Sequence, residues 1–181
     1  DGIYQIGTEN PISGYNATIF NFDIGSNQTL GTTDSNGEFT FDLPPATYQA
    51  DFSAIPAPFD SFTVQDAGAD DVDSDANAAG LTPTLLLTSG GTIENVSVGV
   101  YQSASISGNV WNDDDSDGLL DGGELGYAGT DAILTLLDEN ENLVPGVAPV
   151  NTDSNGDYTF DGLAPSTYIV RITLPTDTAL S

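Results

Sequence analysis

Apolar and polar residues alternate with a period of two in the clearest segments of this chain. Val96, Val98 and Val100 are separated by a polar residue or glycine, and such alternation turns one face of a β-strand toward a core and the other toward solvent. Other short segments rich in β-branched or aromatic residues end at Gly, Pro, Asn or Asp, which are typical of turns. Strands are therefore predicted at residues 16–21, 38–41, 47–52, 61–64, 82–87, 94–101, 105–111 and 131–137. The pattern indicates an all-β chain.

The chain repeats itself at the scale of a domain. GTTDSNGEFTFDLPPATYQADF at residues 31–52 and VNTDSNGDYTFDGLAPSTYIVRI at residues 150–172 share a TDSNG core, an aromatic-Thr-Phe-Asp run and a Leu-x-Pro-x-Thr-Tyr run in the same order. Asp34 and Asp153 are 153 − 34 = 119 positions apart, which is the size of an ordinary domain and too long for a solenoid repeat. We therefore predict two homologous domains, residues 1–102 and 103–181. The link between them is short, so a stiff, end-to-end arrangement is expected.

The two TDSNG segments are predicted to be hairpin turns. The side chains of Asp34 and Asp153 are expected to cap their own turns by Asx-type hydrogen bonds to the backbone. Gly37 and Gly156 are expected in the left-handed conformation, which favours glycine. A structural role is therefore the expected one for these segments.

The chemistry of one stretch follows from its spacing alone. Residues 113–124 read DDDSDGLLDGGE and match positions 1, 3, 5, 6, 9 and 12 of a calcium loop with Asp113, Asp115, Asp117, Gly118, Asp121 and Glu124. The carboxylates, with the Leu119 carbonyl at position 7, supply the oxygens that Ca2+ requires, and Gly118 supplies the positive φ of the turn around the ion. A solvated acidic turn is the alternative. Because the flanking segments read as strands, we interpret the stretch as a calcium loop between strands.

Two other acidic stretches are weaker candidates. Residues 1–9 (DGIYQIGTE) look like the second half of a calcium loop, but Glu9 comes one residue late and Gln5 stands in the place of Asp121. A weaker or remodelled site is expected there. Within residues 66–80, Asp73 and Asp75 are the preferred ligands of a second calcium site, because alternate residues can turn toward one ion. A flexible acidic loop is an equal alternative for this stretch.

The charge of the chain decides which partners to expect. With 28 acidic residues, one Arg, no Lys and no His, the formal net charge is −27, which excludes nucleic acid and anionic membranes as electrostatic partners. Cations are the expected partners, because bound divalent ions offset the self-repulsion of such a chain. A halophile-type surface is the alternative, but it predicts evenly spread acids, whereas many here cluster in loops. No apolar run is long enough for membrane insertion.

The residue types that are absent narrow the function further. Without Cys no disulfide forms, and without Lys no Lys–Asn or Lys–Asp isopeptide crosslink forms, so calcium is the remaining means of stapling the fold. Without His or Cys there is no ordinary base–nucleophile pair, and a single Arg leaves little to hold an oxyanion or a phosphate. Paired carboxylates for glycoside hydrolysis stay open as an alternative. Since the acids cluster as metal ligands, no enzyme is predicted.

The motifs of the second domain resemble a known family. SISGNVWNDDDSDGLLDGGELGYAGTDAILTLLDENENL at residues 105–143, followed by TDSNGDYTFDGLAPSTYIVRITLP at residues 152–175, is similar to the SdrD B-like (Cna B-type) domain of bacterial surface proteins. Residues 1–101 resemble the same domain without its first strand. The resemblance implies two tandem Ig-like antiparallel β-sandwich domains and a rigid stalk in cell-surface proteins. It also implies calcium bound by Asp113, Asp115, Asp117, Asp121 and Glu124, with a further site around residues 73–75.

The sequence predicts a structural role outside the cell. We expect a stalk segment or structural subunit of an extracellular filament or cell-surface protein, rigidified by calcium, with adjacent domains or copies of the same protein as head-to-tail partners. Domain one lacks the counterpart of residues 103–112 and domain two that of residues 59–101, so an excerpt of a longer tandem array is expected. The alternative is an adhesin or carbohydrate-binding module whose aromatic residues stack on sugar rings. Its candidates are Tyr4, Tyr15, Tyr101, Trp111 and Tyr127.

Overall fold

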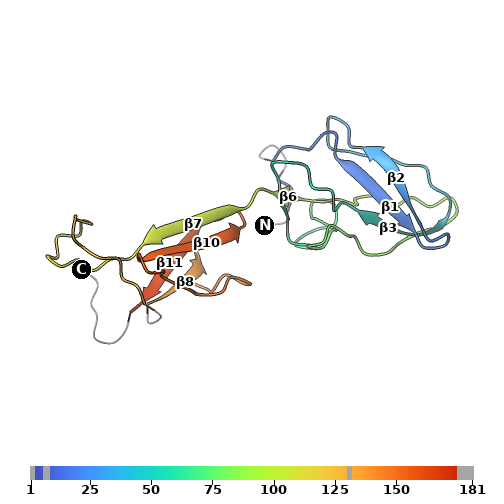
Figure 1. Cartoon of the computed structure of the whole chain (residues 1–181). Helices are drawn as coiled ribbons and strands as arrows, with labels where there is room; N and C mark the ends of the chain where they lie inside the picture. The colour runs from blue at the N-terminus through green and yellow to red at the C-terminus, as the bar shows by residue number, and fades with distance from the viewer. Residues whose placement is uncertain (1–2, 6–8, 130–131, 175–181) are drawn as a thin grey trace. The chain divides into compact units, whose positions relative to one another are not determined.

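The computed structural model describes residues 3–5, 9–129 and 132–174. The chain divides into two compact units, Asp1–Gln102 (unit one) and Ser103–Ser181 (unit two), as Figure 1 shows. The described residues contain no helix, and their paired strands run antiparallel. The strands are β1 (Asn16–Asn21), β2 (Ser26–Thr32), β3 (Ala46–Asp51), β4 (Ser61–Phe62), β5 (Leu85–Leu87), β6 (Val100–Tyr101), β7 (Ala104–Asn109), β8 (Ile133–Asp138), β9 (Val150–Asn151), β10 (Asp157–Leu163) and β11 (Tyr168–Thr173).

Unit one has two antiparallel sheets, and its buried side chains form two clusters that share Leu85. The larger sheet has the strand order β2-β1-β3-β5, and the smaller sheet pairs β4 with β6. Because side chains alternate between the faces of a strand, every second residue of β1 and β3 is buried. The larger cluster of buried side chains consists of Tyr15, Ala17, Ala50, Phe52 and Ala76. Partly buried side chains from the smaller sheet and its neighbours, Phe62, Val96 and Val98, pack against it.

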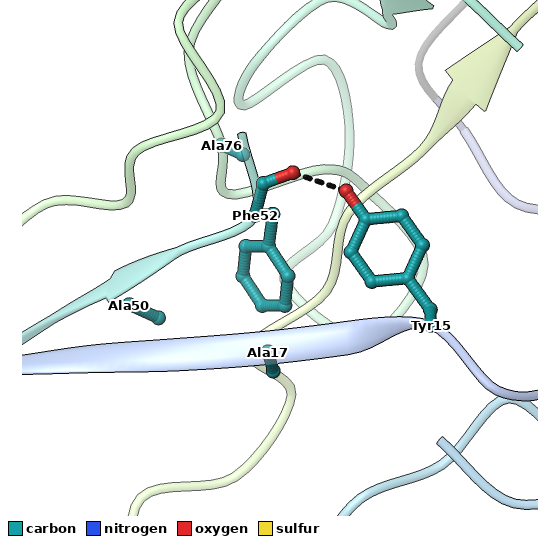
Figure 2. Close-up of a cluster of buried hydrophobic side chains, with 5 residues drawn as sticks. All are labelled: Tyr15, Ala17, Ala50, Phe52 and Ala76. Atoms are coloured by element: carbon teal, nitrogen blue, oxygen red, sulfur yellow. Dashed lines mark hydrogen bonds between the residues drawn. The ribbon is translucent and has the colours of Figure 1, made fainter. Parts of the chain in front are cut away.

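Tyr15 ties the start of β1 to the end of β3 within this core. Its hydroxyl donates a hydrogen bond to the Phe52 carbonyl, and Figure 2 shows the two residues side by side, with the alanines of the cluster around Phe52. Burial, with a smaller contribution from the charge of Asp51, raises the pKa of Tyr15 to about 12. The phenol therefore keeps its proton, and its hydrogen bond, over the whole physiological pH range.

Unit two repeats this architecture. β7 pairs with β10, while β11, β8 and β9 form a three-stranded sheet in that order. Leu134 and Leu136 of β8 are buried together with Phe160 and Leu163 of β10, so the two sheets share one core. Each unit is an antiparallel β-sandwich, and the predicted all-β class is confirmed.

Most of the predicted strands are present, with adjusted ends. The predicted strand at residues 16–21 is β1, and those at 47–52, 61–64, 105–111 and 131–137 differ from β3, β4, β7 and β8 by at most two residues at either end. The predictions at 82–87 and 94–101 are too long, because only β5 and β6 pair there. Val96 and Val98 nevertheless pack on the core, as their alternation predicts. The apolar pattern does not predict β2, because it is a polar edge strand, SNQTLGT, with little alternation.

The predicted strand at residues 38–41 is wrong, although its repeat in unit two is a strand. The homologous residues of unit two lie in β10, which is held by pairing with β7. In the described part of unit one no strand pairs with residues 38–41, and Phe39 instead packs on the core and stacks on Phe41, with ring centroids 5.2 Å apart. A strand exists only where a partner receives its backbone hydrogen bonds, and propensity alone does not supply that partner.

The repeated motifs make the same local bonds in both units. The hydroxyl of Tyr48 donates to the Pro44 carbonyl and that of Tyr168 to the Ala164 carbonyl, each at 2.7 Å. This resembles the tyrosine corner of immunoglobulin-type sandwiches, in which a tyrosine near the start of a strand bonds to the backbone a few residues upstream. The Leu-x-Pro-x-Thr-Tyr run is therefore a corner that leads the chain into β3 in unit one and into β11 in unit two.

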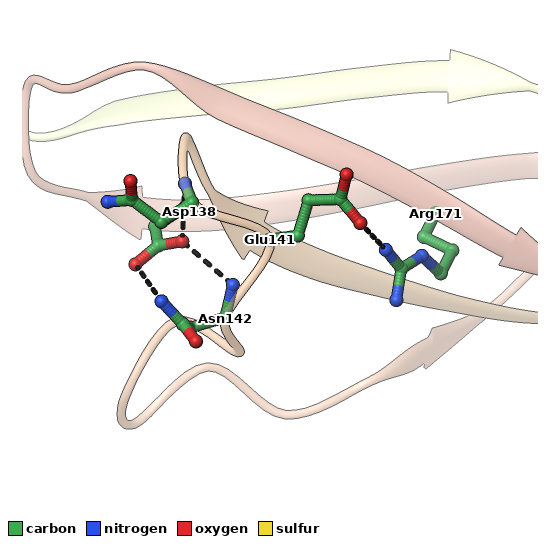
Figure 3. A network of polar contacts seen from close by, with 5 residues as sticks. Asp138, Glu141, Asn142 and Arg171 are labelled. Atoms are coloured by element: carbon green, nitrogen blue, oxygen red, sulfur yellow. Dashed lines mark hydrogen bonds and ion pairs between the residues drawn. The ribbon is translucent and has the colours of Figure 1, made fainter.

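Arg171 in β11, the single basic residue of the chain, forms an ion pair with the hairpin turn after β8. Glu141 contacts Arg171 at 2.8 Å, and both side chains are more than half exposed (Figure 3). In the same turn the Asp138 carboxylate accepts N–H bonds from Asn140 at 2.9 Å and from Asn142 at 2.8 Å. The bond from the Asn142 backbone is the main reason why the pKa of Asp138 lies below its ordinary value. An exposed ion pair adds little stability, so this turn depends mainly on its backbone hydrogen bonds.

Replacing Tyr168 by Phe is expected to remove the corner hydrogen bond and to lower the stability of unit two by about 1 kcal/mol. Trp111, the single tryptophan, lies in unit two, so urea unfolding followed by its fluorescence reports on this unit. Tyr158→Phe is the control, because the Tyr158 hydroxyl makes no hydrogen bond to any described residue while its ring packs on the same core. Equal losses in both variants would contradict a specific role for the corner.

Candidate metal centre

The two ends of the acidic loop 113–124 are hydrogen-bonded to each other. The Asn112 N–H donates to the Leu125 carbonyl at 2.9 Å, and the Tyr127 N–H donates to the Val110 carbonyl at 2.7 Å. Between these bonds Trp111 forms an antiparallel bridge with Gly126. We call residues 110–112 and 125–127 the loop base. It joins the loop to the end of β7.

Three of the predicted ligands meet inside the loop. The carboxylates of Asp113, Asp115 and Asp117 each place an oxygen within 4.8 Å of the others, with Asp113 half-buried and the other two exposed. Gly118 has the predicted positive φ, of 80°. Ser116 also has a positive φ, of 63°, which the spacing did not predict. These two residues bend the chain so that alternate side chains face inward.

The loop is folded by hydrogen bonds to its own acids. The Asp113 carboxylate accepts from the N–H groups of Asp117 at 3.2 Å and Gly118 at 3.0 Å. The Asp117 carboxylate accepts from the Leu119 N–H at 2.8 Å, and the Asp115 carboxylate from the Asp117 N–H at 3.3 Å. An ionised carboxylate has about four lone-pair sites, so each of these groups keeps acceptor capacity for a cation.

Glu124 connects the two ends of the loop. One carboxylate oxygen accepts from the Asp114 N–H and the other from the Asp121 N–H, each at 2.9 Å. Asp121 and Glu124 lie in the same loop as the three aspartates but outside the group whose oxygens meet within 4.8 Å. The Leu119 side chain is 63% exposed, and the role of its carbonyl as a ligand stays a prediction.

The donor set suits a hard divalent cation. It consists of carboxylate oxygens, without His or Cys in the whole sequence, and oxygen-only sets favour Ca2+ or Mg2+ over transition metals. Three carboxylates so close together repel one another, and a cation between them removes that repulsion. The residues present therefore fit calcium.

In unit one the corresponding loop segment keeps part of the same geometry. Asp1 and Gly2, the matches to Asp117 and Gly118, lie outside the described residues. The Gln5 N–H donates to the Glu9 carboxylate at 2.8 Å, as the Asp121 N–H does to Glu124. The extra residue before Glu9 is thus accommodated without loss of this contact. Gln5 nevertheless offers a neutral amide where unit two has a carboxylate.

Asp73 and Asp75, the predicted ligands of a second site, bind backbone groups. The Asp73 side chain is 7% exposed and accepts from the Gly68 N–H at 3.0 Å. The Asp75 carboxylate accepts from the Ser97 N–H at 2.6 Å. Among the described residues they form no group of three acids within 4.8 Å of one another. The two carboxylates staple the acidic segment to its neighbours, and a calcium ion at this place stays a prediction.

The structure also joins two segments that no sequence signal connects. Ile3 forms an antiparallel bridge with Asp73, and the Tyr4 N–H donates to the Val72 carbonyl at 2.5 Å. The acidic segment 66–75 therefore lies against residues 3–5, which belong to the loop segment of unit one. Residues 3–5 and the acidic segment 66–75, far apart in sequence, thus form one region of unit one. Only the tertiary pairing reveals this, because the two partners lack complementary charge or hydrophobic patterns.

The sequence profile of the SdrD B-like domain matches this chain twice, at residues 1–100 and 104–181. The chain belongs to the SdrD B-like domain family. These two SdrD B-like domains correspond closely to the compact units Asp1–Gln102 and Ser103–Ser181. The suspected family resemblance is confirmed.

Similar proteins come from staphylococci and are much longer than this chain. Serine-aspartate repeat-containing protein F of Staphylococcus epidermidis is 34% identical over 179 residues, covering 97% of this chain and 10% of the relative. Protein I of Staphylococcus saprophyticus is 34% identical over 155 residues, covering 80% and 8%. Protein D of Staphylococcus aureus is 29% identical over 164 residues, covering 88% and 12%. The two SdrD B-like domains thus span about a tenth of these curated relatives.

No solved structure matches the two SdrD B-like domains. Within the described residues, no helix has the length and apolar character needed to cross a membrane.

Neutralising Asp75 is expected to stabilise unit one above acidic pH. Burial is the main cause that raises the pKa of Asp75 above its ordinary 3.8, and the nearby charges of Asp70, Asp73 and Asp66 add to it. The folded state then holds this proton more tightly than the unfolded chain, so stability is lost as the pH rises from 3.8 through the raised pKa. Asp75→Asn keeps an acceptor for the Ser97 N–H and removes this loss.

The measurement is the melting temperature of unit one by calorimetry in chelator, from pH 3.5 to 7. The variant should melt higher than the wild type at neutral pH and equally at the acidic end. Asp42→Asn makes the same change in net charge at an exposed position of unit one. An equal gain in Asp42→Asn would assign the effect to net charge and contradict the role of burial.

Proposed function

We propose that the loop 113–124 binds one calcium ion through oxygen ligands. Asp113, Asp115 and Asp117 would hold the ion, with the Leu119 carbonyl, Asp121 and Glu124 completing the shell. The observation that carries this proposal is the convergence of three carboxylates inside a loop whose backbone is already folded by hydrogen bonds. A net charge of −27 makes the chain as a whole attractive to cations.

The bound ion would act as a staple. Its charge offsets the repulsion within the aspartate group, and its bonds connect the first and last residues of the loop, which Glu124 already bridges. A ligand that binds only the folded state stabilises it by mass action, by about 2.7 kcal/mol at a hundredfold excess over Kd. Calcium would therefore make the loop stiffer and unit two more stable, in a chain that has no disulfide.

We further propose that the two domains are a spacer segment in the stalk of a cell-surface protein, exposed outside the cell, with adjacent domains or copies as head-to-tail neighbours. The chain contains two SdrD B-like domains in tandem, and domains of this type resemble those of bacterial surface proteins, which supports this proposal. Calcium would rigidify each domain of such a stalk.

The placement of the aromatic side chains favours a spacer over a carbohydrate-binding module. Tyr15 is 4% exposed and packs in the core of unit one. Tyr101, Trp111 and Tyr127 are half-buried, and Tyr4 is 44% exposed. A row of exposed rings, which sugar stacking requires, is therefore missing from these five candidates.

Calcium binding is expected to disappear or weaken by about tenfold or more in Asp115→Ala, because this change removes one charged ligand. Titration of the full chain, followed by Trp111 fluorescence and calorimetry, measures the Kd. Asp114→Ala is the matched control: it removes the same charge from the same loop, but the Asp114 side chain lies outside the aspartate group. The wild type should bind and the control should change little. A wild-type chain without calcium binding, or equal losses in both variants, would overturn the proposed site.

Chelation is expected to lower the melting temperature of unit two and to increase protease cleavage within residues 113–124. For a domain of this size, each kcal/mol of lost stability lowers the melting temperature by about 4–8 °C. Removing calcium removes the linkage free energy given above, so the shift is large enough to measure. Trp111 fluorescence follows the melting, and mass spectrometry of the fragments locates the cuts. An unchanged melting curve in chelator would mean that the core alone stabilises unit two.

A further inference from the structure

The turn at residues 152–156, one of the two TDSNG segments, touches both legs of the loop base. The Val110 N–H on the entering leg donates to the Gly156 carbonyl at 2.8 Å. On the leaving leg the Thr152 hydroxyl donates to the Tyr127 carbonyl at 2.5 Å. A single turn thus holds the chain on either side of the aspartate group.

Glycines let the turn and the loop base come into direct backbone contact. A Cβ on Gly126 would lie 1.7 Å from the Asn155 carbonyl oxygen, a distance that no side chain tolerates. A Cβ on Gly156 would lie 2.2 Å from the Val110 carbonyl oxygen, and Gly156 also has a positive φ of 83°. Any other residue at either position forces the two backbones apart.

The turn is capped by its own aspartate, as its sequence predicts. The Asp153 carboxylate accepts from the N–H groups of Asn155 at 2.7 Å and Asp157 at 3.0 Å. The Asn109 side chain, at the end of β7, donates to the Asn155 carbonyl at 2.9 Å. Since Asp157 begins β10, the turn is continuous with the sandwich. The turn therefore connects the loop base directly to a strand of the sandwich.

Unit one contains the same threonine bond, although Pro11 stands at the position of Gly126. The Thr33 hydroxyl donates to the Ile12 carbonyl at 2.5 Å, and a Cβ on Gly37 would lie 2.8 Å from the Pro11 Cβ. Ile12 is the third residue after Glu9, just as Tyr127 is the third after Glu124.

The contact persists although the spacing between its partners differs. Thr33 is 33 − 12 = 21 positions after Ile12, whereas Thr152 is 152 − 127 = 25 positions after Tyr127. The intervening hairpins thus differ in length, and the threonine bond is still made in both units. Because the two units are homologous, the recurrence marks the contact as a feature that both copies of the domain keep.

We propose that the Thr152–Gly156 turn positions the calcium loop by fixing its leaving leg three residues beyond Glu124. This inference rests on the calcium site proposed above. A loop held in its binding conformation before the ion arrives loses less conformational freedom on binding, so the ion binds more tightly. Thr152, Gly156 and Gly126 are then positioning residues, which contact the ion's loop and not the ion.

The test compares the calcium affinity of Thr152 variants in the full chain. Thr152→Val keeps the shape of the side chain and removes the hydroxyl, so the Kd should rise by about two- to tenfold, the equivalent of one hydrogen bond. Thr152→Ser restores a hydroxyl and should restore most of the affinity. Gly126→Ala should cause a larger loss, because the added methyl group separates the loop base from the turn.

Two control variants separate positioning from general damage. Thr33→Val makes the same change at the equivalent turn of unit one and should leave the affinity of the loop 113–124 unchanged. Gly146→Ala adds a methyl group to a glycine of unit two that also has a positive φ, of 79°, but with nothing within 4 Å of the added Cβ. It carries the backbone strain of a glycine substitution without a contact to the loop base.

The outcomes are distinguishable. A higher Kd in Thr152→Val, with recovery in Thr152→Ser, supports positioning. A lower melting temperature in chelator with an unchanged Kd would mean that the turn only stabilises the sandwich, which overturns this inference and leaves the calcium site intact. A wild-type chain that binds no calcium overturns both. If Gly126→Ala fails to fold, the Thr152 pair still decides.

Discussion

Mutual repulsion among the acids is the constraint on which the rest of this structure depends. The chain has 28 acidic residues and one Arg, so ion pairs can neutralise almost none of them. Backbone N–H groups serve instead: the carboxylates of Asp113, Asp138 and Asp153 each accept two of them. At Asp138 these hydrogen bonds stabilise the ionised form and hold the pKa of the carboxyl below its ordinary value. The aspartate group of the loop 113–124 differs from these turns because three carboxylates converge there, and a cation is the natural partner for such a group.

The two units show how one motif serves two structural contexts. The corner tyrosines Tyr48 and Tyr168 make the same bond, and the TDSNG turns make the same internal bonds. Directly after the turn the units diverge, because residues 157–163 pair with β7 whereas residues 38–41 have no pairing strand in the described part of unit one. Local hydrogen bonds therefore follow the sequence motif, while strand formation follows the availability of a neighbour.

The TDSNG turn, the loop base and the tyrosine corner each make short-range hydrogen bonds close to the ends of β-strands. Backbone groups take part in most of these contacts. The contact of the turn with the loop base also explains the glycines at positions 126 and 156, which lie outside the proposed ligand set. They allow two backbone segments to approach more closely than any side chain permits.

The sequence by itself determined the all-β class, the repeat, the acidic loop and the positive φ of Gly118, because alternation, turn chemistry and ligand spacing are local properties of neighbouring residues. Tertiary structure alone decided four other features. These are the pairing of residues 3–5 with the segment 66–75, the absence of a strand at 38–41, the backbone bonds of Asp73 and Asp75, and the contact of the TDSNG turn with the loop base. Each depends on which backbone groups find a partner elsewhere in the folded chain, and backbone groups, which every residue carries, leave no compositional signal.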